Sequence, residues 1–175
     1  MKTYKKNVNF SVFVENGSVY RDGGMLGVWF DLPMTEDELE SKFAEIGIAY
    51  HDGLVLNKDY IITDFENNID YEVGDYEPIG LLNNLAERLQ QVDNLVWLTA
   101  YMDETSESLD EAIERYEDNS VWYAGMTLEE VAEEFVDETE NLSDFARRYF
   151  DYEAFAHDLR IDGYVEYDGG VLYVY

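Results

Sequence analysis

Residues 129–140 read EEVAEEFVDETE, a segment with seven acidic residues and no basic one. Starting at Leu128, apolar residues recur at i, i+3, i+4, i+7 and i+8. This spacing predicts an amphipathic helix, because these positions share one face at about 3.6 residues per turn. All seven carboxylates fall on the opposite face, so the helix can fold only if that face meets water or a cationic surface.

Such a face is costly to the helix that carries it. The i,i+4 pairs Glu129/Glu133 and Glu130/Glu134 repel each other by about a few tenths of a kcal/mol each. Asp137 and the acids after it interact unfavourably with the helix dipole, because they lie near its negative C-terminal end. A surface that needed only solubility would include lysines. Two interpretations stay open: a solvated helix face, or a face that copies a polyanion.

The same sign of charge extends along most of the chain. Its 175 residues include 40 acids and 11 bases, for a formal net charge of -29. Residues 31–175 hold 38 of the acids and seven of the bases. With 46% hydrophobic and 15% aromatic residues, the chain has material for a core, unlike a disordered acidic tail. The 15 tyrosines and nine phenylalanines also fit poorly with adaptation to high salt.

This charge limits the partners. Binding to nucleic acid requires a basic footprint, and an anionic membrane would repel the chain. We therefore expect no nucleic-acid and no membrane partner, but a basic protein surface. No apolar run is long enough for a signal peptide or a membrane span, so we expect a cytoplasmic protein.

Catalytic motifs are not found in the sequence. The two histidines, His51 and His157, lie far apart, and the chain has no cysteine, which makes a zinc site improbable. Nucleophile-elbow, P-loop and dinucleotide-binding motifs are missing. Residues 64–75, DFENNIDYEVGD, have calcium-binding composition but lack the sixth-position glycine of an EF-hand loop. Among 40 acids a pair at almost any spacing can be found, so the sequence gives no specific support to a glycosidase that uses two carboxylates. We predict no catalytic residue, no metal, no cofactor and no enzymatic activity.

The chain divides into three predicted modules. Residues 7–66 form a β-sheet with one helix: strands at 8–15, 25–30 and 59–66, and a helix capped by Thr35 and Glu38 that stops at Gly47. Turns requiring positive φ are expected at 16–17 and 22–24.

Residues 67–119 form a helical middle module after an acidic linker, with Pro78 in the first turn of a helix and Ser106 as a cap. Residues 120–175 combine a strand at 120–125, the acidic helix capped by Thr127 and Glu130, two short helices at 143–159 and a hairpin turning at 168–170. The fold class is α+β.

Three stretches resemble the ArdA antirestriction proteins: VFVENGSVYRDGGMLGVWFDLP near the start, DYEPIGLLNNLAERL in the middle and YFDYEAFAHDLRIDGYVEYDGGVLYVY at the end. They follow the family's order across the whole chain, and the ending is the most specific. His157 stands where the family pattern has arginine.

The resemblance implies an elongated homodimer of three small modules that mimics DNA and occupies the DNA-binding groove of a type I restriction-modification enzyme, usually encoded on mobile elements. A charge of -29 matches about 50 Å of duplex, at one charge per ~1.7 Å. The dimer interface is expected at Val121, Trp122 and Tyr123. Candidate phosphate mimics, chosen by expected exposure, are Glu36, Asp37, Glu40, Asp70, Glu72, Asp75, Asp103, Glu104, Glu107, Asp110, Glu111, Glu114, Glu129, Glu130, Glu133, Glu134, Asp137, Glu138 and Glu140.

A second hypothesis comes from a different class of function. The same composition suits an acidic adaptor that binds another basic DNA-associated protein, such as a nucleoid protein or a regulator. A mimic would displace duplex DNA from the restriction enzyme, and an adaptor would not.

Overall fold

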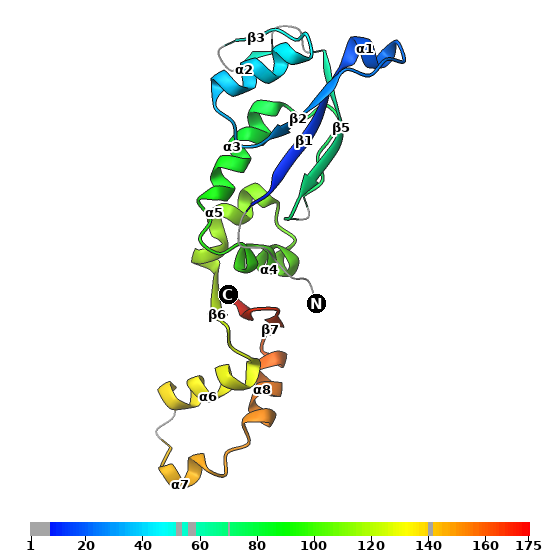
Figure 1. Ribbon diagram of the computed structural model, residues 1–175. Coiled ribbons are helices and arrows are strands. Elements are labelled where there is room, and N and C mark those ends of the chain that lie inside the picture. The colour runs from blue at the N-terminus through cyan, green and yellow to red at the C-terminus, as the bar shows by residue number, and fades with distance from the viewer. Residues whose placement is uncertain (1–7, 52–53, 56–58, 70, 140–141) are drawn as a thin grey trace. The chain divides into compact units, whose positions relative to one another are not determined.

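The computed structural model describes residues 8–51, 54–55, 59–69, 71–139 and 142–175 (Figure 1). Helices and antiparallel strands follow one another along the chain, which confirms the predicted α+β class. The chain divides into two compact units, residues 5–93 and residues 94–175. The division into three modules stays a prediction. None of the helices in the described ranges is both long and apolar enough to cross a bilayer.

The first unit is built on a three-stranded antiparallel sheet of order β2-β1-β5. Its strands are β1 (Phe10–Asn16), β2 (Gly27–Asp31) and β5 (Tyr60–Asn67), close to the three predicted strands. In the central strand Phe10, Val12 and Val14 are at most 1% exposed, as the alternation of apolar residues predicts. One face of the sheet therefore packs against the hydrophobic core.

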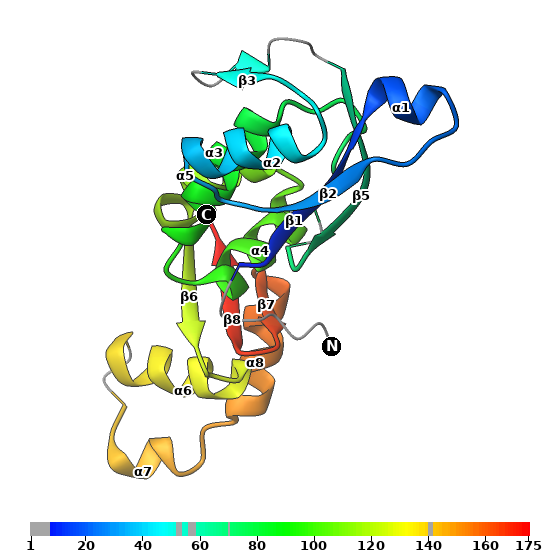
Figure 2. The same ribbon diagram turned by 45° about the horizontal axis from the view of Figure 1, so that its top comes forward.

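Two helices cover that face: α2 (Glu36–Glu45) and α3 (Ile79–Gln90) (Figure 2). The ring of Phe43 on α2 lies 4.9 Å from that of Phe30 on β2, between centroids. The capping box of Thr35 and Glu38 is present, and Gly47 adopts a φ of 69° after the helix, as predicted. Pro78 is the N-cap residue directly before α3.

The first unit also corrects the prediction at residues 16–17. Asn16 has a φ of -65° and caps a short helix, α1 (Gly17–Arg21), by accepting from the amides of Ser18 and Val19. Of the two turns predicted to need a positive φ, only the one at 22–24 has it, at Gly23 with a φ of 79°. A small antiparallel pair, β3 (Tyr50–His51) with β4 (Leu54–Val55), was not predicted, because each strand has only two residues.

The second unit begins with two helices and ends in a sheet. The helices α4 (Leu95–Thr105) and α5 (Leu109–Asn119) precede the strand β6 (Ser120–Ala124). The helices α6 (Leu128–Thr139), α7 (Asp144–Arg147) and α8 (Tyr152–Ile161) follow, and the hairpin β7 (Tyr164–Tyr167) with β8 (Gly170–Val174) closes the chain. The sheet has the order β6-β8-β7, and the turn at Gly169 has a φ of 102°, as predicted.

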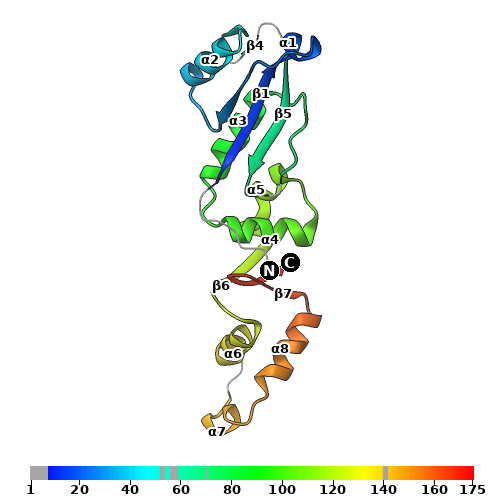
Figure 3. The same cartoon turned by 45° about the vertical axis from the view of Figure 1, so that its right-hand side comes forward.

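Helix α6 packs against α8, and Figure 3 shows the two side by side. Leu128, Val131 and Ala132 of α6 form a buried cluster with Leu159 of α8 and Val171 of β8. Most of the apolar stripe predicted for α6 is thus buried, although its Phe135 is 37% exposed, and the acids lie outside.

Ser106 is not an N-cap, contrary to the prediction. It ends α4 in the left-handed region, with a φ of 56°. Ser108 caps α5 instead, and Glu111 completes a capping box there. The box needs an acid three residues after the cap, which Ser108 has and Ser106 lacks.

Asn83 of α3 ties this helix to the segment before α2. Its Oδ1 accepts from the Met34 N–H at 2.7 Å, and its Nδ2 donates to the Met34 carbonyl at 3.0 Å. The side chain is only 8% exposed. The amide therefore satisfies both backbone groups of Met34 where water has little access.

We expect Asn83→Leu to lower the free energy of unfolding of the first unit by about 2–3 kcal/mol, because it leaves two backbone groups unpaired. Asn84→Leu is the matched control, since its side chain is exposed on the same helix. Native-state hydrogen exchange of amides in β1 and α3 measures the difference. Equal protection in the two variants would contradict the role of Asn83.

Candidate interaction surface

Seventeen of the nineteen candidate carboxylates lie in the described residues, and Asp70 and Glu140 lie outside them. Glu107 is half-buried. The other sixteen are exposed: Glu36, Asp37, Glu40, Glu72, Asp75, Asp103, Glu104, Asp110, Glu111, Glu114, Glu129, Glu130, Glu133, Glu134, Asp137 and Glu138.

Helix α6 carries the densest row of these groups. Six exposed carboxylates lie between Glu129 and Glu138. At about 1.5 Å per residue, this row covers about 14 Å of helix axis. Duplex DNA carries about eight charges over the same length. The helix thus reaches roughly three quarters of the linear charge density of DNA on a single face.

Two of the candidates also hold helix ends in place. The Glu130 carboxylate accepts from the N–H of Thr127 at 2.8 Å and from its hydroxyl at 3.1 Å. Glu111 does the same for Ser108 at the start of α5. The pKa of Glu130 is lowered, mainly because the Thr127 N–H donates to the ionised form. The Ser108 hydroxyl is the main cause that lowers the pKa of Glu111.

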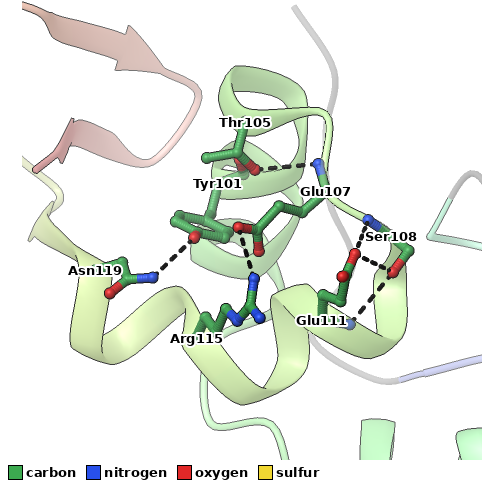
Figure 4. A network of polar contacts seen from close by, with 7 residues as sticks. All are labelled: Tyr101, Thr105, Glu107, Ser108, Glu111, Arg115 and Asn119. Atoms are coloured by element: carbon green, nitrogen blue, oxygen red, sulfur yellow. Dashed lines mark hydrogen bonds and ion pairs between the residues drawn. The ribbon is translucent and has the colours of Figure 1, made fainter.

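Glu107 belongs to a network between α4 and α5 (Figure 4). Its Oε1 lies 3.4 Å from Nη1 of Arg115, while its Oε2 is buried without a hydrogen bond. The N–H of Glu107 donates to Thr105 at 3.3 Å, and Asn119 donates to Tyr101 at 3.4 Å. Because Glu107 is engaged with Arg115 and partly covered, it is a structural residue of the α4–α5 turn.

Other candidates have neighbours that orient them. The Tyr50 hydroxyl donates to Glu36 at 2.8 Å, and burial, followed by this bond, raises the pKa of Tyr50 to about 12. The Tyr167 hydroxyl donates to Glu104 at 2.6 Å. Each of these phenols thus donates a hydrogen bond to an exposed carboxylate.

Several bases pair with acids close to them, so their charge is compensated locally. Asp137 of the acidic row forms an ion pair with Arg147 of α7. Four further pairs join Arg21 to Asp59, Lys42 to Glu45, Arg115 to Glu107 and Arg160 to Glu166. Exposed pairs of this kind add little stability. Arg148 is also exposed, so the described surface is acidic but not of a single sign.

The candidates chosen from the sequence did not include the exposed carboxylates on the first sheet. Asp31, Asp64 and Glu66 are all exposed on β2 and β5. In the register Asp64 pairs with Phe13 and Glu66 with Ser11, on the face away from the core. The alternation of each strand could have identified them, because Phe13 and Ser11 are out of phase with the buried Val12.

The residues considered for other roles are placed as follows. His157 is exposed on α8, and the side chain of His51 lies outside the described parts. Within the described ranges, no three or more His, Asp or Glu side chains gather where they could hold a metal ion. Val121, Trp122 and Tyr123 lie half-buried on β6, at the edge of its sheet.

The family model described as antirestriction protein (ArdA) matches residues 12–173, almost the whole chain. A search of curated proteins finds no significant match.

The capping role of Glu130 predicts a pH dependence. Because its folded pKa is below the ordinary value of 4.5, ionised Glu130 stabilises the fold above that pH, and the gain is lost as the pH falls through the folded pKa. We expect Glu130→Ala to be less stable than the wild-type protein at pH 7, with a difference that shrinks in acid. Thermal unfolding from pH 3 to 7 measures this.

The control is Glu129→Ala, which removes an acid from the same first turn without removing a capping bond. It should keep most of the stability at pH 7. Equal losses in the two variants would show that the cap contributes nothing beyond the helix dipole.

Proposed function

The chain belongs to the ArdA family of antirestriction proteins, and from this premise we propose that it inhibits a type I restriction-modification enzyme as a mimic of duplex DNA. Its surface carboxylates take the place of phosphates and contact the lysines and arginines of the enzyme's DNA-binding groove. The observation that carries the proposal is the row of exposed carboxylates on α6, whose charge density approaches that of DNA. The family consists of inhibitors, and we expect no catalysis by this chain.

Binding of this kind gains free energy from many weak contacts. Each carboxylate that meets a lysine or arginine allows counterions of both surfaces to be released, so affinity falls as salt rises. The apolar stripe of α6 supports this mechanism, because it holds the carboxylates on a packed body before the partner arrives. The ordering of the anions then costs little at binding.

A reversal of the α6 row tests the mechanism. We expect the variant with Glu129, Glu133, Glu134 and Glu138 all changed to lysine to lose inhibition, because four charges change sign on one face and the net charge rises by eight units. These four positions leave the cap at Glu130 and the ion pair at Asp137 intact. Circular dichroism checks the fold, and DNA cleavage by a type I enzyme gives the readout.

Glu133→Gln is the matched single change, and it should cost only a few-fold in affinity, with the salt slope reduced by about one unit. Loss of inhibition by this single variant with an intact fold would contradict distributed mimicry. So would an affinity that does not change with salt. Competition separates the acidic-adaptor hypothesis: a mimic displaces duplex DNA from the enzyme, and an adaptor leaves it bound.

We also propose that the protein acts as a homodimer through the edge of β6. This strand pairs with β8 on one side, in a register that joins Val121 to Tyr173. It stands at the end of the order β6-β8-β7, so no strand among the described residues pairs with its other side, where a second copy could add a strand. Two joined copies would double the length of duplex that the charge matches.

Light scattering should therefore give twice the 20.4 kDa of one chain at micromolar concentration. We expect Val121→Lys to shift the mass to one chain, because it places charge at the contact. Ile161→Lys, at a residue 72% exposed on α8, is the control and should stay dimeric. A wild-type protein that runs as a single chain contradicts the dimer, and thermal unfolding confirms that both variants are folded.

A further inference from the structure

The sheet of the first unit has an outer face, on the side away from α2 and α3 (Figure 2). The register places seven side chains there: Ser11, Phe13 and Glu15 of β1, Trp29 and Asp31 of β2, and Asp64 and Glu66 of β5. The acids of β2 and β5 are exposed, so this face of the first unit meets solvent.

An aromatic pair lies at the centre of the outer face. Phe13 is the cross-strand neighbour of Trp29, and their half-buried rings lie 5.4 Å apart between centroids, inclined by 55°. Gly27 makes room for the pair. A Cβ atom at Gly27 would lie 2.8 Å from Cε1 of Phe13 and 2.6 Å from Cγ of Glu15. The ring of Phe13 therefore lies directly against the backbone of β2.

Exposed carboxylates surround this pair. Asp64 is the cross-strand neighbour of Phe13 on β5, with Cα atoms about 5 Å apart. Asp31 and Glu66 both neighbour Ser11, so they lie on the same face about 7 Å further along the strands. The Ser11 hydroxyl donates to Oδ1 of Asp31 at 2.8 Å. The three strands contain no lysine or arginine, so the charge around the rings has one sign.

Glu15 adds a fourth carboxylate to this face, and it is buried. The residue is only 6% exposed, and the Thr63 hydroxyl donates to its Oε2 at 2.7 Å. Within the described ranges, no lysine or arginine forms an ion pair with Glu15. Because water and salt screen a buried charge only weakly, Glu15 strengthens the attraction of the outer face for a cation.

We infer that the outer face binds an arginine of a basic partner protein. A guanidinium is planar, offers five N–H donors and stacks on aromatic faces, among which tryptophan is the strongest partner for a cation. The pair of Phe13 and Trp29 provides the stacking surface. The exposed carboxylates around the pair accept the N–H groups in charge-assisted hydrogen bonds.

Other occupants fit this face less well. A second copy of the chain would bring the same acids into contact with each other, and nucleic acid would likewise be repelled. A metal ion is disfavoured, because the described residues bring together no three His, Asp or Glu side chains that could hold one. Lysine carries a compact and strongly hydrated charge, so it gains less from the rings.

The inference rests on the proposed function, since the arginine belongs to the DNA-binding groove of the restriction enzyme. It adds a contact of a different kind. The row on α6 attracts positive charge without regard to the shape of the side chain. The outer face also selects for a planar group, which favours arginine over lysine.

The test uses acetylated tri-arginine amide and tri-lysine amide as probes at constant ionic strength. In nitrogen-15 NMR spectra of the full chain, tri-arginine should shift the indole N–H signal of Trp29 in a saturable way. Tri-lysine should bind this face about two- to fivefold more weakly. Trp97, which donates to Ser120, and Trp122, which packs against Gly170, are internal controls in the second unit and should hardly shift.

Three outcomes would overturn the inference. One is a common shift of all three indole signals, which would mean diffuse attraction to the acidic chain. Another is equal affinity for the two peptides, which would leave no role for the rings. The third is a Trp29 signal that moves with protein concentration alone, which would assign the outer face to a second copy. None of these measurements depends on a variant that must fold.

An aromatic substitution tests the stacking surface. Trp29→Leu should weaken tri-arginine binding about two- to fivefold and remove the preference over tri-lysine, followed through the backbone amides of Asp64 and Glu66. Phe65→Leu is the matched control, because Phe65 neighbours Val12 on the opposite face of the same sheet. It should keep the affinity and the preference. Equal weakening by the two variants would overturn the stacking role.

Two double variants with the same change in charge test the carboxylates. Asp64→Asn with Glu66→Gln should weaken binding at Trp29 about fivefold, because two exposed acceptors lose their charge. Glu133→Gln with Glu134→Gln, on α6, should leave the Trp29 titration unchanged. Equal losses would mean that net charge alone attracts the probe. Signals away from the changed residues report whether each variant keeps its fold.

These results are independent of the restriction assay. If the wild-type protein binds tri-arginine selectively at Trp29 but does not displace DNA from the enzyme, the proposed function fails and the arginine site stands. If it displaces DNA but gives no selective response to arginine, the site fails and the mimicry stands.

Discussion

The fold depends on apolar stripes that pack strongly enough to hold rows of like charge together. Helix α6 shows this most clearly: Leu128, Val131 and Ala132 are buried against α8, while six carboxylates lie on the outer face. Burying side chains of this size contributes about 1.5–3 kcal/mol each for valine or leucine, whereas each repulsive i,i+4 pair costs only a few tenths. Packing therefore exceeds repulsion, and the acidic face can be kept without compensating bases.

Some of the acids reduce the cost that the others impose. Glu38, Glu111 and Glu130 each complete a capping box at the start of a helix, where a negative charge also interacts well with the dipole. At the other ends, α4, α5 and α6 have no base in the last turn. Helices α5 and α6 thus gain stability at their N-termini and give it up at their C-termini, where a lysine would interrupt their acids. Helices α2 and α8, by contrast, carry Lys42 and Arg160 in their last turns.

Periodicity predicted the main strands and helices because their core faces repeat over many residues. It failed where one side chain decides the backbone: Asn16 caps α1 instead of forming a turn, and Ser108, not Ser106, caps α5. The exposed acids of α6 follow directly from the stripe opposite them. The position of Glu107 does not, because its ion pair with Arg115 of α5 joins residues that the sequence pattern does not bring together.

In the proposed function, a folded polyanion has an advantage over a disordered one of equal charge. A disordered chain loses conformational freedom when it meets a basic groove, at a cost of about 1–2 kcal/mol for each ordered residue of backbone. Here the backbone under the acids of α5, α6 and β5 is already held by helical hydrogen bonds, a capping box and strand pairing. The favourable electrostatic free energy then contributes to affinity, because little of it is needed to compensate for conformational entropy lost by the inhibitor.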